Sequence, residues 1–334
     1  MNAIKAITAI PGVLGKEKSF RRNPILGSER FNRWGLHRFR VNLAANLATW
    51  RRKRLAHLID GDDRRFFEEN GYFIRENFLS DEDFATVKRE LFDTPHQAHE
   101  MHQGQTITRR MTPDGSESRV AKSIFRNRQI RDYMSYAAGR SGEPVISIQA
   151  IIANPAIKTA DPQTDMHADT FHSTAKMWLF LTDVEEDDGP FVYVPGSNQL
   201  TPERLEWEFQ QSLTAAKDAR LHHSAGSFRL REEELPSLGY GPPKRMTVKA
   251  NTLVVADTFG FHHRSPSDRL TKRVELYGYL RRNPFLPWNG LDMMSLPGLR
   301  GHLPDLYFHY LKARKKYLGK KHGWKDVGKI LIDS

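Results

Sequence analysis

The chain has 334 residues, of which 39% are hydrophobic and 27% charged, and its formal net charge is +11. This length and composition suit a folded core with extensions and exclude wholesale disorder. No apolar run approaches the roughly 20 residues of a membrane-spanning helix, and the absence of Cys excludes disulfides and thiolate metal ligands.

Positive charge gathers at the two ends of the chain. Residues 1–55 hold 13 Lys and Arg against two Glu, and residues 305–334 hold eight against three Asp, which leaves the middle of the chain at −5. A nucleic-acid reader would carry its basic surface on the folded body, so we do not expect nucleic acid as a partner. Pro11 and Gly12 interrupt the first apolar run, so no signal peptide is expected. We predict a cytoplasmic protein that is at most peripheral to a membrane.

Residues 36–58 predict a basic amphipathic helix within a basic N-terminal extension, residues 1–60. Its large apolar residues recur at spacings of three to eight and approximate one helical face, with arginines on the remainder. They are Leu36, Phe39, Leu43, Leu47, Trp50 and Leu58. Two interpretations stay open: weak contact of the arginines with an anionic surface such as lipid head groups, or a helix docked on the domain with a solvated basic face.

The following residues, 61–290, predict one domain that is mainly β with flanking helices. A helix ending at Gly71 precedes a short strand at 72–78, and Ser80 marks the start of a second helix. From residue 145 onward, short apolar strands alternate with turns rich in Gly, Pro and Asp, which is typical of a β-sandwich or barrel. A charged, partly helical insert at 200–240 is a candidate lid, and residues 291–334 predict a basic helical extension.

A candidate metal site begins with His167 and Asp169. They stand two apart, so on an extended strand both side chains project to the same face. A second strand runs out into His262 and His263. Two histidines and one carboxylate form the facial triad that is typical of non-haem Fe(II) oxygenases. The residues alone leave the choice between the two adjacent histidines open.

The strand that begins near Lys272 has one polar face. Arg273, Glu275 and Tyr277 share that face, and the intervening residues are apolar. The planar guanidinium of Arg273 matches a carboxylate fork, so it can bind the free end of a dicarboxylate cosubstrate.

Taken together, these motifs resemble the phytanoyl-CoA dioxygenase family of Fe(II)- and 2-oxoglutarate-dependent oxygenases. The resemblance covers residues 65–285 and lies in "FFEENGYFIRENFLSDEDF", "MHADTF", "KMWLFLTDVEEDDGPFVYVPGSNQ", "NTLVVADTFGFHHR" and "KRVELYGYL". It implies a double-stranded β-helix (jelly-roll, cupin-like) core. It also implies a dioxygenase that uses Fe(II), 2-oxoglutarate and O2, with ascorbate as a candidate reductant, to hydroxylate an unactivated C–H bond of a small molecule, lipid or natural product and release succinate and CO2.

Carried over by position, the resemblance implies that His167, Asp169 and His262 bind iron and that Arg273 holds the distal carboxylate of 2-oxoglutarate. The eleven residues from His262 to Arg273, and the place of His262 directly after "GF", favour it over His263. The resemblance also places Trp178 along the cosubstrate.

Three further positions bear on this interpretation. Asp169 argues for oxygen transfer, because halogenating relatives carry a small residue there. Asn198 follows "PGS" where the family often has His, and Arg264 stands where a small hydroxyl residue is frequent. The hydrogen bonding of the distal carboxylate is therefore open. For His172, a surface or turn position is the default interpretation, with substrate contact as the alternative. For Lys176, a strand-edge position is the default, with a position toward the cosubstrate as the alternative.

Two rival functions stay open at this stage. A cupin-like metalloprotein that does not use 2-oxoglutarate, whether an oxygenase, an isomerase or a binding module, would keep the triad but would have no need for Arg273. A non-enzymatic basic protein would dock on an anionic surface through its ends.

Overall fold

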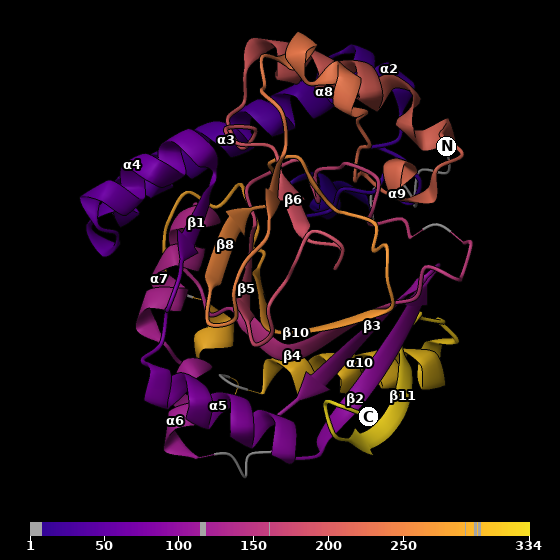
Figure 1. The fold of residues 1–334 in the computed structure, drawn as a ribbon. Helices are drawn as coiled ribbons and strands as arrows, with labels where there is room; N and C mark the ends of the chain where they lie inside the picture. The colour runs from indigo at the N-terminus through magenta and orange to yellow at the C-terminus, as the bar shows by residue number, and fades with distance from the viewer. Residues whose placement is uncertain (1–8, 114–117, 160, 291, 297–298, 300–301) are drawn as a thin grey trace.

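The computed structural model describes residues 9–113, 118–159, 161–290, 292–296, 299 and 302–334, and it contains two antiparallel sheets with helices around them (Figure 1). Residues 1–8, which begin the segment predicted to lack a signal peptide, lie outside the described residues. Among the helices of the described part, none is long and apolar enough to cross a membrane.

The larger sheet has eight strands and the smaller sheet has three. The larger sheet contains, in spatial order, β1 (Tyr72–Arg75), β8 (Leu253–Asp257), β5 (Ala175–Phe180), β10 (Thr271–Leu280), β4 (Val145–Ala153), β3 (Thr106–Thr112), β2 (His96–Gln103) and β11 (Lys325–Ile330). The smaller sheet contains β7 (Lys244–Met246), β6 (Phe191–Tyr193) and β9 (His262–Arg264). All neighbouring strands pair antiparallel. This is the jelly-roll core that the sequence predicted.

The two-residue period of the strands gives the larger sheet an outer and an inner face. Val274 and Leu276 of β10 point outward into the main apolar cluster, which also holds side chains of the helices on that side. Trp178 and Tyr277 point inward and pack with Phe191 of the smaller sheet. The polar face predicted for β10 is therefore the inner face, between the two sheets.

Helices surround the sheets. They are α2 (Glu29–Arg33), α3 (Leu36–Leu55), α4 (Gly61–Asn70), α5 (Asp81–Asp93), α6 (Arg119–Ile124), α7 (Arg128–Ala137), α8 (Pro202–Thr214), α9 (Leu221–Ser224) and α10 (Leu303–Leu318). Local sequence signals set their ends. Ser80 caps α5 by accepting a hydrogen bond from the Asp83 N–H, and Gly71 ends α4 with a left-handed backbone (φ 82°), as its position in the sequence predicted.

Helix α3 is present, but it does not bury the face that the apolar spacing predicted. Phe39 is 64% exposed and Trp50 38% exposed, while Arg40 and Arg51 are buried. Arg51 donates hydrogen bonds to the carbonyls of Gly139, Pro284 and Leu286, and Arg40 donates to three carbonyls within residues 13–17. The long guanidinium side chains reach loop carbonyls that shorter residues could not satisfy. A solvated basic face is therefore wrong for these two arginines.

The structure agrees fully with the elements predicted for the 200–240 insert, but only in part with those predicted for the C-terminal segment. The insert at 200–240 contains α8 and α9, as its charged pattern suggested, and Figure 1 shows α8 lying beside α3. The C-terminal segment contains the predicted helix, α10, and also β11, which adds an edge strand to the larger sheet beside β2. The sequence analysis did not predict β11. The division of the chain at residues 60 and 290 stays a prediction.

Candidate active site

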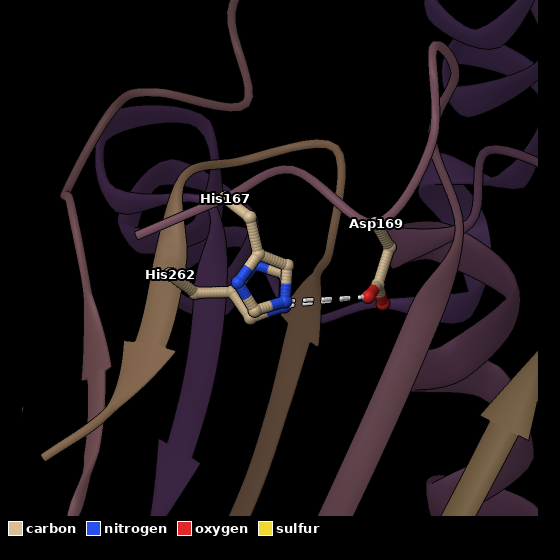
Figure 2. Close-up of side chains that lie close together, drawn as sticks. All are labelled: His167, Asp169 and His262. Atoms are coloured by element: carbon tan, nitrogen blue, oxygen red, sulfur yellow. Dashed lines mark ion pairs between the residues drawn. The ribbon is translucent and has the colours of Figure 1, made fainter. Parts of the chain in front are cut away.

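His167, Asp169 and His262 meet at one point between the two sheets (Figure 2). One ligand atom from each lies within 4.8 Å of the others, and no other such cluster occurs among the residues that the structure describes. The Nε2 atoms of His167 and His262 lie 3.8 Å and 3.7 Å from Oδ1 of Asp169.

Backbone hydrogen bonds hold the two histidines next to each other, independently of their side chains. The N–H of His167 donates to the carbonyl of His262, and the N–H of His262 donates to the carbonyl of His167, each at 2.9 Å. The imidazole Nδ1 atoms lie 2.7 Å and 2.8 Å from the carbonyls of Asp165 and Gly260, to which they donate. This sets the tautomer and leaves both Nε2 lone pairs facing Asp169.

His262, and not His263, lies in this cluster. Successive residues of β9 project to opposite faces, and the Nδ1 atom of His263 lies 3.1 Å from the carbonyl of Arg264 instead. Nε2 of His262 is buried without a hydrogen-bond partner. A buried nitrogen acceptor with no partner is costly unless a ligand or ion meets it.

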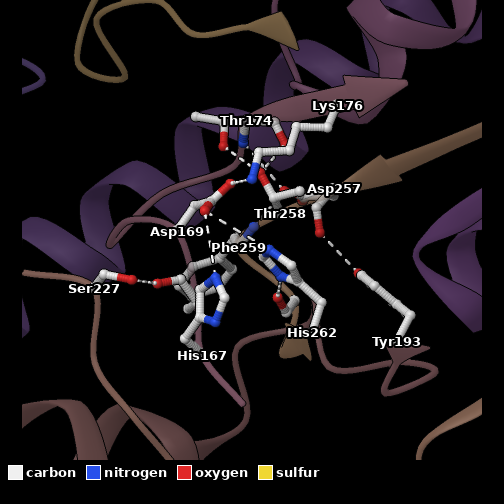
Figure 3. Close-up of polar contacts among 12 residues, drawn as sticks. His167, Asp169, Thr174, Lys176, Tyr193, Ser227, Asp257, Thr258, Phe259 and His262 are labelled. Carbon is white, nitrogen blue, oxygen red and sulfur yellow. Dashed lines mark hydrogen bonds and ion pairs between the residues drawn. The ribbon is translucent and has the colours of Figure 1, made fainter. Parts of the chain in front are cut away.

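Lys176 holds the second oxygen of the carboxylate. Its Nζ lies 2.6 Å from Oδ2 of Asp169, and Figure 3 draws this ion pair as a dashed line. Burial opposes ionisation of Asp169, but the charge of Lys176 and the histidines outweigh it and hold the pKa of the carboxyl well below its usual range. Burial likewise works against the ammonium of Lys176, yet Asp169 raises the pKa of Lys176. Asp169 is therefore a charged carboxylate with one oxygen left for a metal.

The strand-edge interpretation of Lys176 is wrong. Strand β5 lies between β8 and β10 in the interior of the sheet, so its inward side chains point at the site. The surface interpretation of His172 is wrong as well, because that residue is 2% exposed and its Nδ1 lies 2.9 Å from the carbonyl of Ser173. Burial lowers the pKa of His172 well below its usual range.

The turn that leads from β8 to His262 is anchored on a buried carboxylate. Asp257 is fully buried, accepts hydrogen bonds from the N–H groups of Thr174 and Phe259, and forms an ion pair of 2.6 Å with Arg52 of α3. In the same turn, the carbonyl of Thr258 accepts the N–H of Asp169 at 3.0 Å (Figure 3). One turn thus positions two of the three clustered residues.

A cavity of about 400 Å³ opens beside the cluster. Arg273 and Trp178 both line it, so the structure brings all five sequence-predicted site residues to one place. The guanidinium of Arg273 is 5% exposed, donates to the carbonyl of Gly189 and lies 3.2 Å from the fully buried Glu275. The ring of Trp178 packs on Phe191, with centroids 4.3 Å apart.

Arg264 also lines the cavity, at the position where the family resemblance leads one to expect a small hydroxyl residue. Its Nη1 lies 2.8 Å from the fully buried carboxylate of Asp161. Burial, first, and the charge of Arg273 lower the pKa of Arg264 to about 10. Ser265 beside it is buried, and its Oγ lacks a hydrogen-bond partner. A hydroxyl is therefore present near this wall, one residue later than expected.

The insert at 200–240 contacts Ala168, which stands between the clustered residues His167 and Asp169. The N–H of Ala168 donates to the carbonyl of Phe228, and Oγ of Ser227 donates to the carbonyl of Ala168. His222 of the same insert lines the cavity. The sequence offered no signal for these contacts, because they join segments about 60 residues apart.

The sequence model of the phytanoyl-CoA dioxygenase family matches residues 67–254, which include His167, Asp169 and Trp178 and end before His262 and Arg273. No curated protein matches the chain in sequence.

Several solved structures resemble the fold at low identity. The non-haem, α-ketoglutarate-dependent carbocyclase SnoK from nogalamycin biosynthesis is 17% identical, with a TM-score of 0.43, and 66% of this chain and 84% of that chain are covered. The epimerase SnoN, in complex with Fe3+, α-ketoglutarate and nogalamycin RO, is 15% identical, with a TM-score of 0.44 and coverage of 73% and 91%. HygX from Streptomyces hygroscopicus, with nickel, 2-oxoglutarate and hygromycin B bound, is 12% identical, with a TM-score of 0.39 and coverage of 66% and 87%.

The assignment rests on the sequence match, which spans more than half of the 334 residues, and on the cluster of two histidines and one aspartate inside the jelly roll. Both agree with the prediction of a dioxygenase that uses non-haem iron and 2-oxoglutarate. The chain belongs to the phytanoyl-CoA dioxygenase family.

Proposed function

We propose that this dioxygenase hydroxylates an unactivated C–H bond of a small-molecule substrate, with His167, Asp169 and His262 as its iron ligands. The observation that carries the proposal is the convergence of two imidazole Nε2 atoms and one carboxylate oxygen within 4.8 Å. Such a facial triad leaves three coordination positions for a cosubstrate and O2.

The residues present fit iron. Nε2 of His262 has no partner in the described protein, the carboxylate of Asp169 is charged, and each imidazole is oriented by a backbone carbonyl. Lys176 occupies the second oxygen of Asp169, which favours binding of a metal through one carboxylate oxygen. Iron held here would bind the keto-acid end of 2-oxoglutarate and activate O2.

Arg273 would hold the other end of 2-oxoglutarate. Its Nη1 and Nε already face the Gly189 carbonyl and Glu275, which fixes the plane of the guanidinium. A fixed fork loses little conformational entropy when it receives a carboxylate. Trp178 gives the cavity an apolar wall. The contacts of residues 227–228 with Ala168, together with His222 in the cavity lining, support a role for the 200–240 insert as a lid that excludes water.

The test measures succinate and CO2 formed from 2-oxoglutarate by the iron-loaded protein. Arg273→Ala should raise the KM for 2-oxoglutarate by about 100-fold, because a charge-assisted bidentate contact is lost. Arg245→Ala is a matched control, since Arg245 is exposed on the smaller sheet and, among the residues that the structure describes, forms an ion pair with Glu186 alone. An Arg273→Ala protein with an unchanged KM would remove 2-oxoglutarate from this cavity and favour a cupin-like metalloprotein.

Contact with an anionic membrane surface stays a proposal, with fewer basic residues of α3 available for it than the sequence suggested. Helix α3 commits Arg40, Arg51 and Arg52 to internal contacts, and leaves Lys53 and Arg54 exposed. A Lys53→Glu, Arg54→Glu protein should sediment less with anionic vesicles at low salt if α3 provides the contact. Unchanged sedimentation would remove α3 from it. A cytoplasmic location also stays a prediction.

A further inference from the structure

Four cationic side chains line the active-site cavity, and three of them have a carboxylate partner. Lys176 pairs with Asp169, Arg264 with Asp161 and Arg273 with Glu275. The fourth, Arg110 of β3, forms no ion pair with any residue that the structure describes. It is the charge in this cavity that the protein itself leaves uncompensated.

The side chain of Arg110 is nevertheless held in place. Its guanidinium lies over the ring of Tyr277, 4.3 Å from the centroid, and 5.4 Å from the centroid of Trp324. Its Nε donates to the side-chain oxygen of Gln149 at 3.3 Å, and the side-chain NH2 group of Gln149 donates to Glu275. Two cation–π contacts and one hydrogen bond hold the guanidinium in place.

The free part of Arg110 is the part that recognises anions. Within the described residues, its two Nη groups donate no hydrogen bond. Neither of these nitrogen atoms is among the buried atoms without a partner, so both are accessible from the cavity that Arg110 lines. A fixed guanidinium with two free N–H edges matches a carboxylate or phosphate bidentately, and a partly desolvated charge without a counter-ion favours an anionic ligand.

We propose that Arg110 binds an anionic group, a carboxylate or a phosphate, of the substrate to be oxidised. The proposal rests on the proposed function, in which the two carboxylates of 2-oxoglutarate go to iron and Arg273 and leave Arg110 for a third anion. Tyr277 lines the same cavity and offers an aromatic ring to the apolar body beside that anion.

Trp324 ties this subsite to the C-terminal segment, which lies beyond the part of the chain that matches the family model. Gly323, next to it, lies beside Met101, which lines the cavity: a Cβ at Gly323 would be 3.4 Å from the Met101 sulfur, an ordinary contact distance. On the same inner face, the ring of His99 stacks on Phe308 of α10 at 3.7 Å. The C-terminal segment therefore contacts Arg110 through Trp324, and no described residue of that segment lines the cavity itself.

The test uses the full-length enzyme loaded anaerobically with Fe(II) and 2-oxoglutarate. Binding of 2-oxoglutarate is measured first, by the absorbance of its complex with iron. The probes are 4-fluorobenzoate, 4-fluorophenyl phosphate and the neutral 4-fluorobenzamide, whose dissociation constants come from 19F line broadening by the iron. The proteins compared are the wild type, Arg110→Gln, Arg110→Lys and the control Arg245→Gln.

We expect the wild type and Arg245→Gln to bind at least one anionic probe about tenfold more tightly than the amide. Preference for the carboxylate or for the phosphate tells which anion the substrate carries. Arg110→Gln should abolish the preference and leave 2-oxoglutarate affinity unchanged, and Arg110→Lys, which keeps the charge but loses the fork, should retain part of it.

Three results would overturn the proposal: no anionic preference in the wild type, a preference that survives Arg110→Gln, or a tenfold loss of 2-oxoglutarate affinity in Arg110→Gln. Failure of the wild type to bind Fe(II) and 2-oxoglutarate would instead refute the proposed function. If Arg110→Gln does not fold, the intermediate affinity expected of Arg110→Lys carries the test.

Discussion

Replacing Arg52 of α3 should damage both the fold and the metal site. Its guanidinium is 15% exposed, forms a 2.6 Å ion pair with the fully buried Asp257, and donates to the carbonyls of Tyr136 and Ala137 and to Oγ of Ser173. Arg52→Met removes these donors and leaves the carboxylate buried with only two backbone N–H partners.

The expected cost is large because a buried charge loses its counter-ion. Breaking a buried ion pair from one side costs about 3–5 kcal/mol, and we expect the free energy of unfolding of Arg52→Met to fall by that amount. Asp257→Asn should cost less, about 1–3 kcal/mol, because an amide oxygen still accepts from Thr174 and Phe259. The double variant should cost less than the sum, with a coupling energy of about 2 kcal/mol.

Urea unfolding of the four proteins measures these energies, and Co(II) titration of the folded variants measures the effect on the site. Because the 257–260 turn holds both Asp169 and His262, Arg52→Met should weaken Co(II) binding by about 10-fold, as loss of supporting contacts around metal ligands does. A destabilisation below about 1 kcal/mol, or additive single effects, would show that α3 does not support the turn through this pair.

Three further predictions concern the site and its surroundings. His262→Ala should abolish Co(II) binding, whereas His263→Ala should keep it; the reverse result in the same titration would exchange their roles. Co(II) at 100 times its Kd should stabilise the protein by about 2.7 kcal/mol, seen as a rise in Tm of a few degrees that EDTA reverses and Asp169→Ala lacks; an equal rise in that variant would place the metal elsewhere. Burial and Arg220 lower the pKa of His223 from 6.5 to about 4, so the unfolded chain binds a proton there first. The free energy of unfolding should therefore be unaffected by His223 above pH 6.5 and should fall by about 3 kcal/mol between pH 6.5 and pH 4. Urea unfolding across this range should show a shallower fall for His223→Gln. An unchanged slope in that variant would show that His223 does not cause the loss of stability.

Local patterns predicted the elements that position the site. Two-residue spacing placed His167 and Asp169 on one face, and the alternation in β10 correctly assigned Arg273 and Tyr277 to the inner face. These predictions succeed because strand geometry relates side-chain direction directly to sequence spacing.

The predictions that failed concern contacts between segments that are distant in the sequence. Lys176 points into the site because β5 is an interior strand, and strand order is not contained in a local pattern. Helix α3 buries Arg40 and Arg51 because loop carbonyls of distant segments lie within their reach. Strand β11, "KDVGKI", carries too few apolar residues to alternate and forms by pairing with the edge of β2.

The reciprocal backbone bonds between His167 and His262 have a consequence for how the enzyme acquires its iron. These two proposed iron ligands are 95 residues apart in the sequence, and main-chain pairing that needs no metal closes the loop between them. The ordering entropy of bringing distant ligands together is therefore part of folding and is absent from iron binding. Iron can then leave and return, as oxidation and exchange require, while the scaffold that receives it stays assembled.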